Sequence, residues 1–197
     1  MGKLSRLIGA VFAAVSLSVV SLNAIAADAP ETITVTSSAF DHHGTVPEEY
    51  TAYSENKSID LSWSNLPAGT VQLALICDDP EVVTIGMMET PFPHWVAYNI
   101  PASASGLPED MTKDAVVAGV AGLDGMINGL NGTRRPGYFG PRPPVNGHLH
   151  AYHFRVYAID SDLDLAEGLN KDELLAAIDG HVLATGMLMG HYERKEQ

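Results

Sequence analysis

The sequence predicts a mainly β fold, an antiparallel two-sheet sandwich with a Greek-key-like strand order. Short segments rich in β-branched and aromatic residues recur along the chain. Most of them alternate apolar and polar positions with period two, as half-buried strands do. Turn-forming glycine and proline lie between them, and the helices that would connect parallel strands are missing there. This combination is typical of a sandwich rather than of an α/β fold.

Five segments are expected to form strands. The segment at 32–36 (TITVT) has high β-propensity. Those at 59–63, 94–100 and 151–159 alternate apolar and polar residues. The segment at 71–77 (VQLALIC) is apolar at nearly every position, which predicts a central strand.

Helix is expected only near the C-terminus. Asn170 is a good N-cap, and Glu173 stands three residues later as in a capping box. The helix that follows should stop at Gly180, and residues 181–189 are expected to form a second short helix. The segment 119–144 is rich in glycine and proline, so we expect a long ordered loop, which in a compact domain is usually functional.

Residues 1–26 are typical of a secretory signal peptide. Basic residues precede an uncharged, mostly apolar run at 7–22, and Ala24-Ile25-Ala26 supplies the small-x-small pattern of a cleavage site. A retained N-terminal anchor is the alternative, although the run is short for a membrane span. We therefore expect a single domain at 27–197 without a transmembrane segment. The protein would be exported, to the periplasm in a Gram-negative bacterium and otherwise to the medium.

Charge and cysteine content exclude several classes of protein. The chain has 11 Lys and Arg against 24 Asp and Glu, a formal net charge of −13, so no nucleic-acid-binding surface is expected. The single cysteine excludes an intramolecular disulfide scaffold, and its apolar surroundings predict that it is buried.

Three of the chain's 11 basic residues, Arg134, Arg135 and Arg142, lie close together in the glycine- and proline-rich segment. Guanidinium groups match the oxygens of phosphate and carboxylate, so the cluster predicts an anion site. The alternative is that these arginines pair with acidic residues of the surface.

Other polar side chains are expected to meet near this segment. His148, His150 and Tyr152 share parity, so on an extended strand they would project from one face. The Asp-Asp-Pro-Glu run at 78–81 ends one predicted strand, and His94 begins another. Together they could gather carboxylates, imidazoles and a phenol around one small cavity.

Three kinds of chemistry could use this set. A metal could bind His148, His150 and a carboxylate, but Arg155 follows where His-x-His metal enzymes carry a glutamate nearby, so no metal is expected. A hydrolase would need a nucleophile; no G-x-S-x-G motif is present, and Cys77 lies in an apolar strand. The third possibility is a pocket that binds a small anion.

Several segments resemble, in composition and in order, the phosphatidylethanolamine-binding protein family, which includes the Raf kinase inhibitor proteins. They are DDPE at 78–81, PHWVAYNIP at 93–101, GYFGPRPPVNGHLHAYHFRVYAID at 137–160 and GHVLATGMLMGHY at 180–192. The similarity covers residues 33–194 and is greatest to the bacterial branch of the family. It implies a two-sheet antiparallel fold with a small anion pocket and short C-terminal helices.

The resemblance also implies which residues form the pocket. Two acids match the family's D-P-D/E segment, and one histidine precedes the tryptophan. A glycine and two prolines match the G-x-P-P rim. A histidine and a tyrosine match the H-R-Y motif. The first of the two acids is expected to orient a histidine and to favour its protonated form. These eight pocket residues are Asp79, Glu81, His94, Gly140, Pro143, Pro144, His150 and Tyr152, with Arg134, Arg135, Arg142 and His148 as candidate rim residues.

The sequence departs from the family pattern at three places. Ala151 replaces the arginine of H-R-Y, and Arg142 stands where bacterial relatives often carry cysteine. Met87 and Met88 replace the usual Ala-Pro continuation in a loop that should border the pocket, where a methionine pair is expected to fill a gap in the core.

The resemblance implies regulatory binding rather than catalysis. The leading hypothesis is an exported, non-enzymatic protein without a cofactor that binds a phosphate monoester, a phospholipid head group or a phosphorylated partner. The main alternative is an inhibitor of a protease or kinase in which the pocket is only structural support. A weaker one is a hydrolase or lyase with His94 and His150 as acid and base. A homodimer is the assembly that the resemblance suggests.

Overall fold

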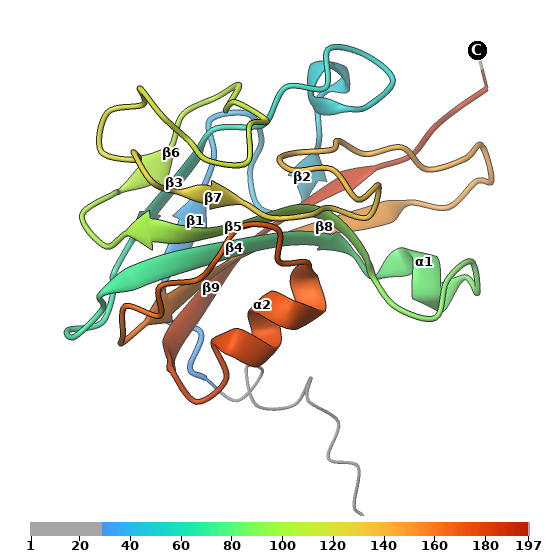
Figure 1. The fold of residues 1–197 in the computed structure, drawn as a ribbon. Helices are drawn as coiled ribbons and strands as arrows, with labels where there is room; N and C mark the ends of the chain where they lie inside the picture. Colours follow the sequence, from blue (N-terminus) through green and yellow to red (C-terminus); the bar gives the residue numbers. More distant parts are fainter. Residues whose placement is uncertain (1–28, 197) are drawn as a thin grey trace, which may run out of the picture.

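The computed structural model describes residues 29–196, which form two β-sheets and a few short helices (Figure 1). The predicted mainly β, two-sheet architecture is confirmed. The signal peptide expected at 1–26 lies outside the described residues. Within them, no helix has the length and apolar character needed to cross a bilayer.

The larger sheet has six strands in the order β2-β9-β8-β4-β5-β7. Neighbouring strands run antiparallel except β2 and β9, which are parallel. Along the chain the strands are β2 (Gly44–Thr45), β4 (Gln72–Asp79), β5 (Phe92–Pro101), β7 (Ile127–Asn128), β8 (His150–Ile159) and β9 (Val182–Tyr192).

The smaller sheet has three antiparallel strands in the order β1-β3-β6: β1 (Thr34–Thr36), β3 (Leu61–Ser64) and β6 (Gly106–Leu107). A single 3₁₀ turn follows β2, at Glu48–Tyr50. The short helix α1 (Glu81–Thr84) lies at the end of β4, and α2 (Lys171–Ala177) packs on one face of the larger sheet (Figure 1).

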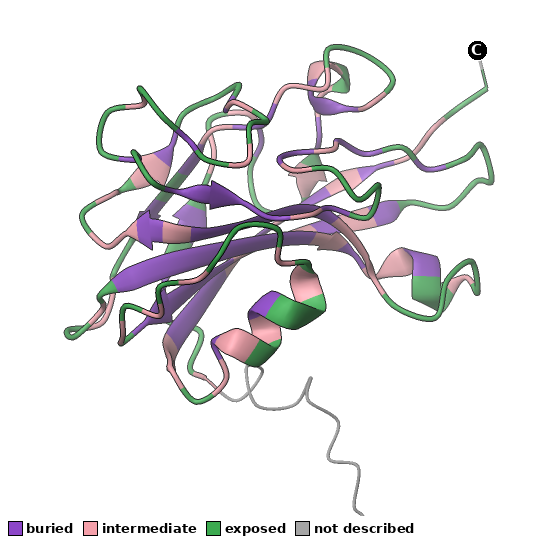
Figure 2. Cartoon of the chain, in the orientation of Figure 1, coloured by how far each residue is buried: buried purple, intermediate pink, exposed green. Residues whose placement is uncertain are grey.

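Strand β4 separates two apolar layers, as its sequence predicted. Leu73, Leu75 and Cys77 belong to the core cluster shared with the smaller sheet, whereas Ala74 and Ile76 belong to the cluster that also contains α2. Because successive strand residues face opposite sides, a strand buried on both faces must be apolar throughout. Figure 2 shows β4 buried along its length, with most exposed residues in the loops.

The second helix expected at 181–189 is wrong, because these residues belong to β9. From Gly186 onward, buried and partly exposed residues alternate, and β9 pairs with β8 along nearly its whole length. The glycines have a packing role: a Cβ at Gly186 would lie 2.0 Å from the carbonyl oxygen of Ile33. Leu, Ala and Met favour helix locally, but pairing in the sheet overrides this preference.

Two smaller expectations also need correction. Helix is not confined to the C-terminal region, because α1 and the 3₁₀ turn at Glu48–Tyr50 precede it. The segment 119–144 is mostly loop, yet it contributes β7 at the edge of the larger sheet. The strand residues pair with Ala97 and Tyr98 of β5, which anchors the loop beside the site described below.

The capping box of α2 is confirmed and gives a direct prediction. The Asn170 side chain accepts hydrogen bonds from the backbone N–H groups of Asp172 and Glu173, and Glu173 accepts one from Asn170 N–H. We expect Asn170→Ala to lower the free energy of unfolding by about 1 kcal/mol in urea denaturation. Glu167→Ala, at an exposed position just before the helix, is the control and should stay within about 0.5 kcal/mol of the parent. Equal values for the two variants would contradict the capping role.

Candidate functional site

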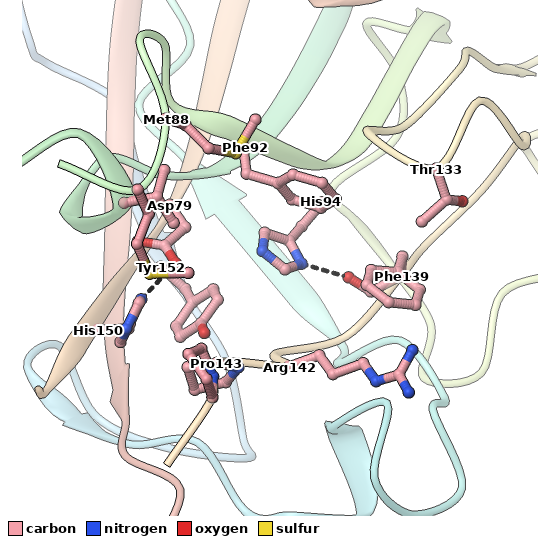
Figure 3. Close-up of a pocket in the computed structure, with 13 residues that line it drawn as sticks. Asp79, Met88, Phe92, His94, Thr133, Phe139, Arg142, Pro143, His150 and Tyr152 are labelled. Atoms are coloured by element: carbon pink, nitrogen blue, oxygen red, sulfur yellow. Dashed lines mark hydrogen bonds and ion pairs between the residues drawn. The ribbon is translucent and has the colours of Figure 1, made fainter. Parts of the chain in front are cut away.

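A cavity of about 230 Å³ lies where the end of β4 meets the beginnings of β5 and β8 (Figure 3). The loop that follows α1 and the segment before β8 complete its walls. Six of the eight predicted pocket residues line it: Asp79, His94, Pro143, Pro144, His150 and Tyr152. Arg142, a predicted rim residue, lines it as well.

Asp79 and His150 form a buried pair at one end of the cavity. Asp79 is the last residue of β4, and His150 is the first of β8. His150 Nδ1 lies 2.7 Å from Asp79 Oδ2, and Glu81 N–H donates to Asp79 Oδ1 over 2.9 Å. Nδ1 therefore donates to the carboxylate, and the ring is oriented by Asp79, as expected from the sequence. The other ring nitrogen, Nε2, is buried without a hydrogen-bond partner among the described residues.

Tyr152 lies two residues further along β8 and faces the same side. Its side chain is buried, and its hydroxyl also has no partner within the described part of the chain. Burial raises the pKa of Tyr152, and the nearby charge of Asp79 adds to this effect. The hydroxyl therefore keeps its proton and can act as a donor.

His94 is held from one side by the loop that precedes β8. Its Nδ1 lies 2.6 Å from the carbonyl oxygen of Phe139, to which it donates, and the two rings are stacked. Burial lowers the pKa of His94, partly opposed by the bond to Phe139 and the charge of Asp79. The ring is therefore neutral near pH 7, with a free lone pair on Nε2. In Figure 3 this nitrogen faces the side of the cavity where Asp79 and Tyr152 lie.

Glu81 and Gly140 do not line the cavity. Glu81 begins α1 and contributes its backbone N–H to Asp79. Gly140 lies against the 3₁₀ turn: a Cβ there would approach the carbonyl oxygen of Tyr50 to 2.1 Å, and its N–H donates to Asn56 Oδ1. Both residues support the site rather than face a ligand.

The shared face predicted for His148, His150 and Tyr152 holds only for the last two. Strand β8 begins at His150, so His148 lies in an exposed loop where parity has no meaning. Its backbone N–H donates to Asn146 Oδ1. His148 and His150 therefore do not form a pair of metal ligands, and no cluster in the described chain brings three His, Cys, Asp or Glu together for a metal.

The three arginines do not form one rim. Arg142 lines the cavity, whereas Arg135 lines a neighbouring cavity and Arg134 lines a third one together with Lys171 and Asp172. A tight turn separates the two consecutive residues: Arg134 N–H donates to the carbonyl oxygen of Asn131, and Arg134 has a φ of 61°.

Sequence reasoning missed the aromatic part of the wall. Phe92 and Phe139 flank His94, with ring centroids 4.9 and 5.9 Å from the imidazole. Phe92 shares parity with His94 on β5, so the alternation used for the other residues could have identified it. Met87 and Met88 also line the cavity but do not fill a gap in the core, since they are 50% and 43% exposed.

Comparison with known proteins places this geometry in a family. The sequence model described as phosphatidylethanolamine-binding protein matches residues 36–193, a range that includes every residue of the cavity. The chain belongs to the phosphatidylethanolamine-binding protein family. The resemblance inferred from four sequence segments is thereby confirmed.

Relatives and solved structures of this family cover most of the chain. A UPF0098 protein of Methanothermobacter thermautotrophicus is 40% identical over 156 residues, which are 79% of this chain and 95% of the relative. A crystal structure of a phosphatidylethanolamine-binding protein homologue from Chlamydia trachomatis is 33% identical, with a TM-score of 0.72 over 84% of this chain and 99% of that one. YbcL of E. coli shares the fold, with a TM-score of 0.74 at 24% identity over 83% and 99% of the two chains.

Proposed function

We propose that this protein is an exported, non-enzymatic binding protein whose cavity holds a small phosphate-type anion. The anion would be a phosphate monoester, a phospholipid head group or a phosphorylated side chain of a partner. The observation that carries the proposal is that His150 and Tyr152, which line the cavity, each keep a buried polar atom without a partner in the described structure. Buried polar atoms are nearly always hydrogen-bonded, so a ligand is the natural partner.

The chemistry of the lining suits an anion. The Tyr152 hydroxyl is a donor, and two further residues with donor groups, Arg142 and Thr133, line the cavity. The charge of Asp79 is already engaged by His150 and by the backbone N–H of Glu81. Much of the remaining wall is apolar, which strengthens hydrogen bonds to a charged ligand.

Size limits the ligand. The cavity of about 230 Å³ is smaller than the roughly 300–1,000 Å³ of sites for drug-sized molecules, and it accommodates a phosphate group with a short substituent. This favours recognition of a head group or monoester rather than of a whole lipid.

Catalysis has less support than binding. Cys77, the single cysteine of the sequence, is fully buried in the core, and burial raises its pKa, so it stays protonated. Asp79 and the Phe139 carbonyl hold Nδ1 of His150 and of His94, so an acid–base role would depend on the two Nε2 atoms alone. We expect no phosphate release from a chromogenic phosphate monoester.

A protein inhibitor remains the second candidate because of the surface around the cavity mouth. Five of the eight large exposed apolar residues of the described chain lie in α1, in the loop that follows it and in the loop before β8, namely Val83, Met87, Met88, Val145 and Leu149. An apolar rim of this kind is typical of a surface that contacts a partner. An inhibitor would act through these loops and keep its activity when the cavity residues are replaced.

Calorimetric titration with inorganic phosphate and phosphoethanolamine at low salt tests the proposal. We expect saturable binding that weakens about tenfold or more in Tyr152→Phe, because a hydrogen bond to a charged group contributes roughly 1.5–3 kcal/mol. Tyr152→Phe removes one oxygen that bonds to nothing in the described residues, so the fold should be unaffected. His148→Gln, in the exposed loop, is the control and should bind like the parent. Equal affinity in Tyr152→Phe and the parent, or no binding in the parent, would refute the proposal.

A further inference from the structure

A second cavity, of about 570 Å³, adjoins the first. The two share three wall residues, Thr133, Phe139 and Arg142, so they lie side by side. The wall of the second cavity consists of residues from the segment 131–142, together with Asn56 and Lys113. Two arginines of the predicted cluster, Arg135 and Arg142, line this second cavity, whereas Asp79 and His150 do not.

An excess of positive charge distinguishes this second cavity. Lys113, Arg135 and Arg142 line it, and no carboxylate does, in a chain whose formal net charge is −13. Elsewhere in the described chain, Lys57, Lys171 and Arg194 pair with acidic side chains. Arg135 and Arg142 make no ion pair with any described residue.

The local backbone holds the ammonium group of Lys113 and shapes the turn that carries Arg135. Lys113 Nζ donates to the carbonyl oxygen of Asn56 over 2.8 Å, and desolvation lowers the pKa of Lys113, partly opposed by the charge of Asp110. The turn from Asn131 to Arg135 is closed by a backbone hydrogen bond of 2.9 Å. In Figure 3 the guanidinium of Arg142 points away from Asp79 and His150, so its charged end is available to the neighbouring cavity.

We propose that the cavity lined by Lys113, Arg135 and Arg142 is a second anion subsite. Together with the first cavity it would take a ligand with two anionic groups on a short scaffold, for example a phosphate ester that also carries a carboxylate. The part of this inference that concerns the first group rests on the proposed function, whereas the second subsite stands on its own residues.

Physical chemistry supports this arrangement. A guanidinium group presents a planar set of donors that matches the two oxygens of a carboxylate or phosphate. A partly buried lysine whose positive charge is disfavoured by desolvation gains from a nearby anion. A ligand that satisfies both cavities at once would therefore bind more tightly than one that reaches only the first.

Phosphoserine and phosphoethanolamine test the inference, because they differ by a single carboxylate. We expect the parent protein to bind phosphoserine about tenfold more tightly in calorimetric titrations. In Arg135→Gln the ratio of the phosphoserine affinity to the phosphoethanolamine affinity should fall toward one. Arg134→Gln is a matched control, since it removes the same charge from the adjacent residue, which lies outside the second cavity. The proposal of a ligand with two anionic groups would be overturned if Arg135→Gln and Arg134→Gln preferred phosphoserine equally, or if the parent protein showed no preference for phosphoserine.

NMR titration with inorganic sulfate separates this inference from the proposed function. Shifts of the Lys113 and Arg135 signals that persist in Tyr152→Phe, together with loss of the Lys113 shift in Arg135→Gln, would support the second subsite, even if the first cavity bound nothing. Unchanged Lys113 and Arg135 signals would overturn the second subsite. If the parent protein still bound phosphoethanolamine more tightly than Tyr152→Phe did, the proposed function would stand without the second subsite.

Discussion

Asp79→Ala is expected to lower the free energy of unfolding by about 3–5 kcal/mol, because two hydrogen bonds to a buried carboxylate are lost. Asp79 and His150 are both almost completely inaccessible to solvent, at 3% and 0% exposure. The substitution leaves His150 Nδ1 and the Glu81 N–H without their acceptor. Urea denaturation with parallel fluorescence and circular dichroism measurements gives the difference.

The neighbouring residue supplies the control for this prediction. Asp78 also ends β4 and pairs with Lys171, but both side chains retain some solvent contact. Asp78→Ala should therefore cost only about 1 kcal/mol or less. Because successive strand residues face opposite sides, it also leaves the cavity intact. A loss in Asp79→Ala no larger than in Asp78→Ala would show that the buried pair does not stabilise the fold.

The affinity of the cavity for sulfate is expected to fall with rising pH, by up to about tenfold per pH unit. Burial lowers the pKa of His94, so in the free protein its Nε2 carries a lone pair near neutral pH, which repels an anion. A bound anion favours the imidazolium form and raises that pKa. Binding therefore takes up a proton. The loss of affinity occurs between the His94 pKa of the free protein and its higher value in the complex.

Sulfate is the probe for this experiment because, unlike phosphate, it stays doubly charged between about pH 5 and 8, where histidines titrate. The charged groups that act on His94 are Asp79 and Asp78, and the Phe139 carbonyl holds its other nitrogen. His94→Gln keeps a polar side chain that does not titrate, so the part of the pH dependence due to His94 should vanish in calorimetric titrations. An identical pH profile in the parent and in His94→Gln would contradict the proton linkage.

Much of the fold could be predicted because its strands carry their signals locally. The alternation at 94–100 and 151–159 and the continuous apolar run at 71–77 each correspond to a strand of the larger sheet. Parity also placed His150 and Tyr152 on the same face, because both lie within one strand. The capping box at Asn170 is equally local, since all of its atoms come from four consecutive residues.

Features decided by distant contacts could not be predicted in this way. Strand β9 contains good helix formers, and only its pairing with β8 and the close approach of Ile33 to Gly186 explain its conformation. The separation of Arg134 from Arg135 depends on a left-handed residue in a tight turn, which a run of two arginines does not reveal. The exposure of Met87 and Met88 likewise depends on how the loop after α1 lies over the cavity.

The position of β9 also bears on when the chain can fold. It is the last strand in sequence, yet it lies between β2 and β8 in the larger sheet. Until residues 182–192 have left the ribosome, β8 has an unpaired edge and the sheet is incomplete. Long-range pairing of this kind is slow to form. The larger sheet is therefore completed only when the last strand in sequence becomes available.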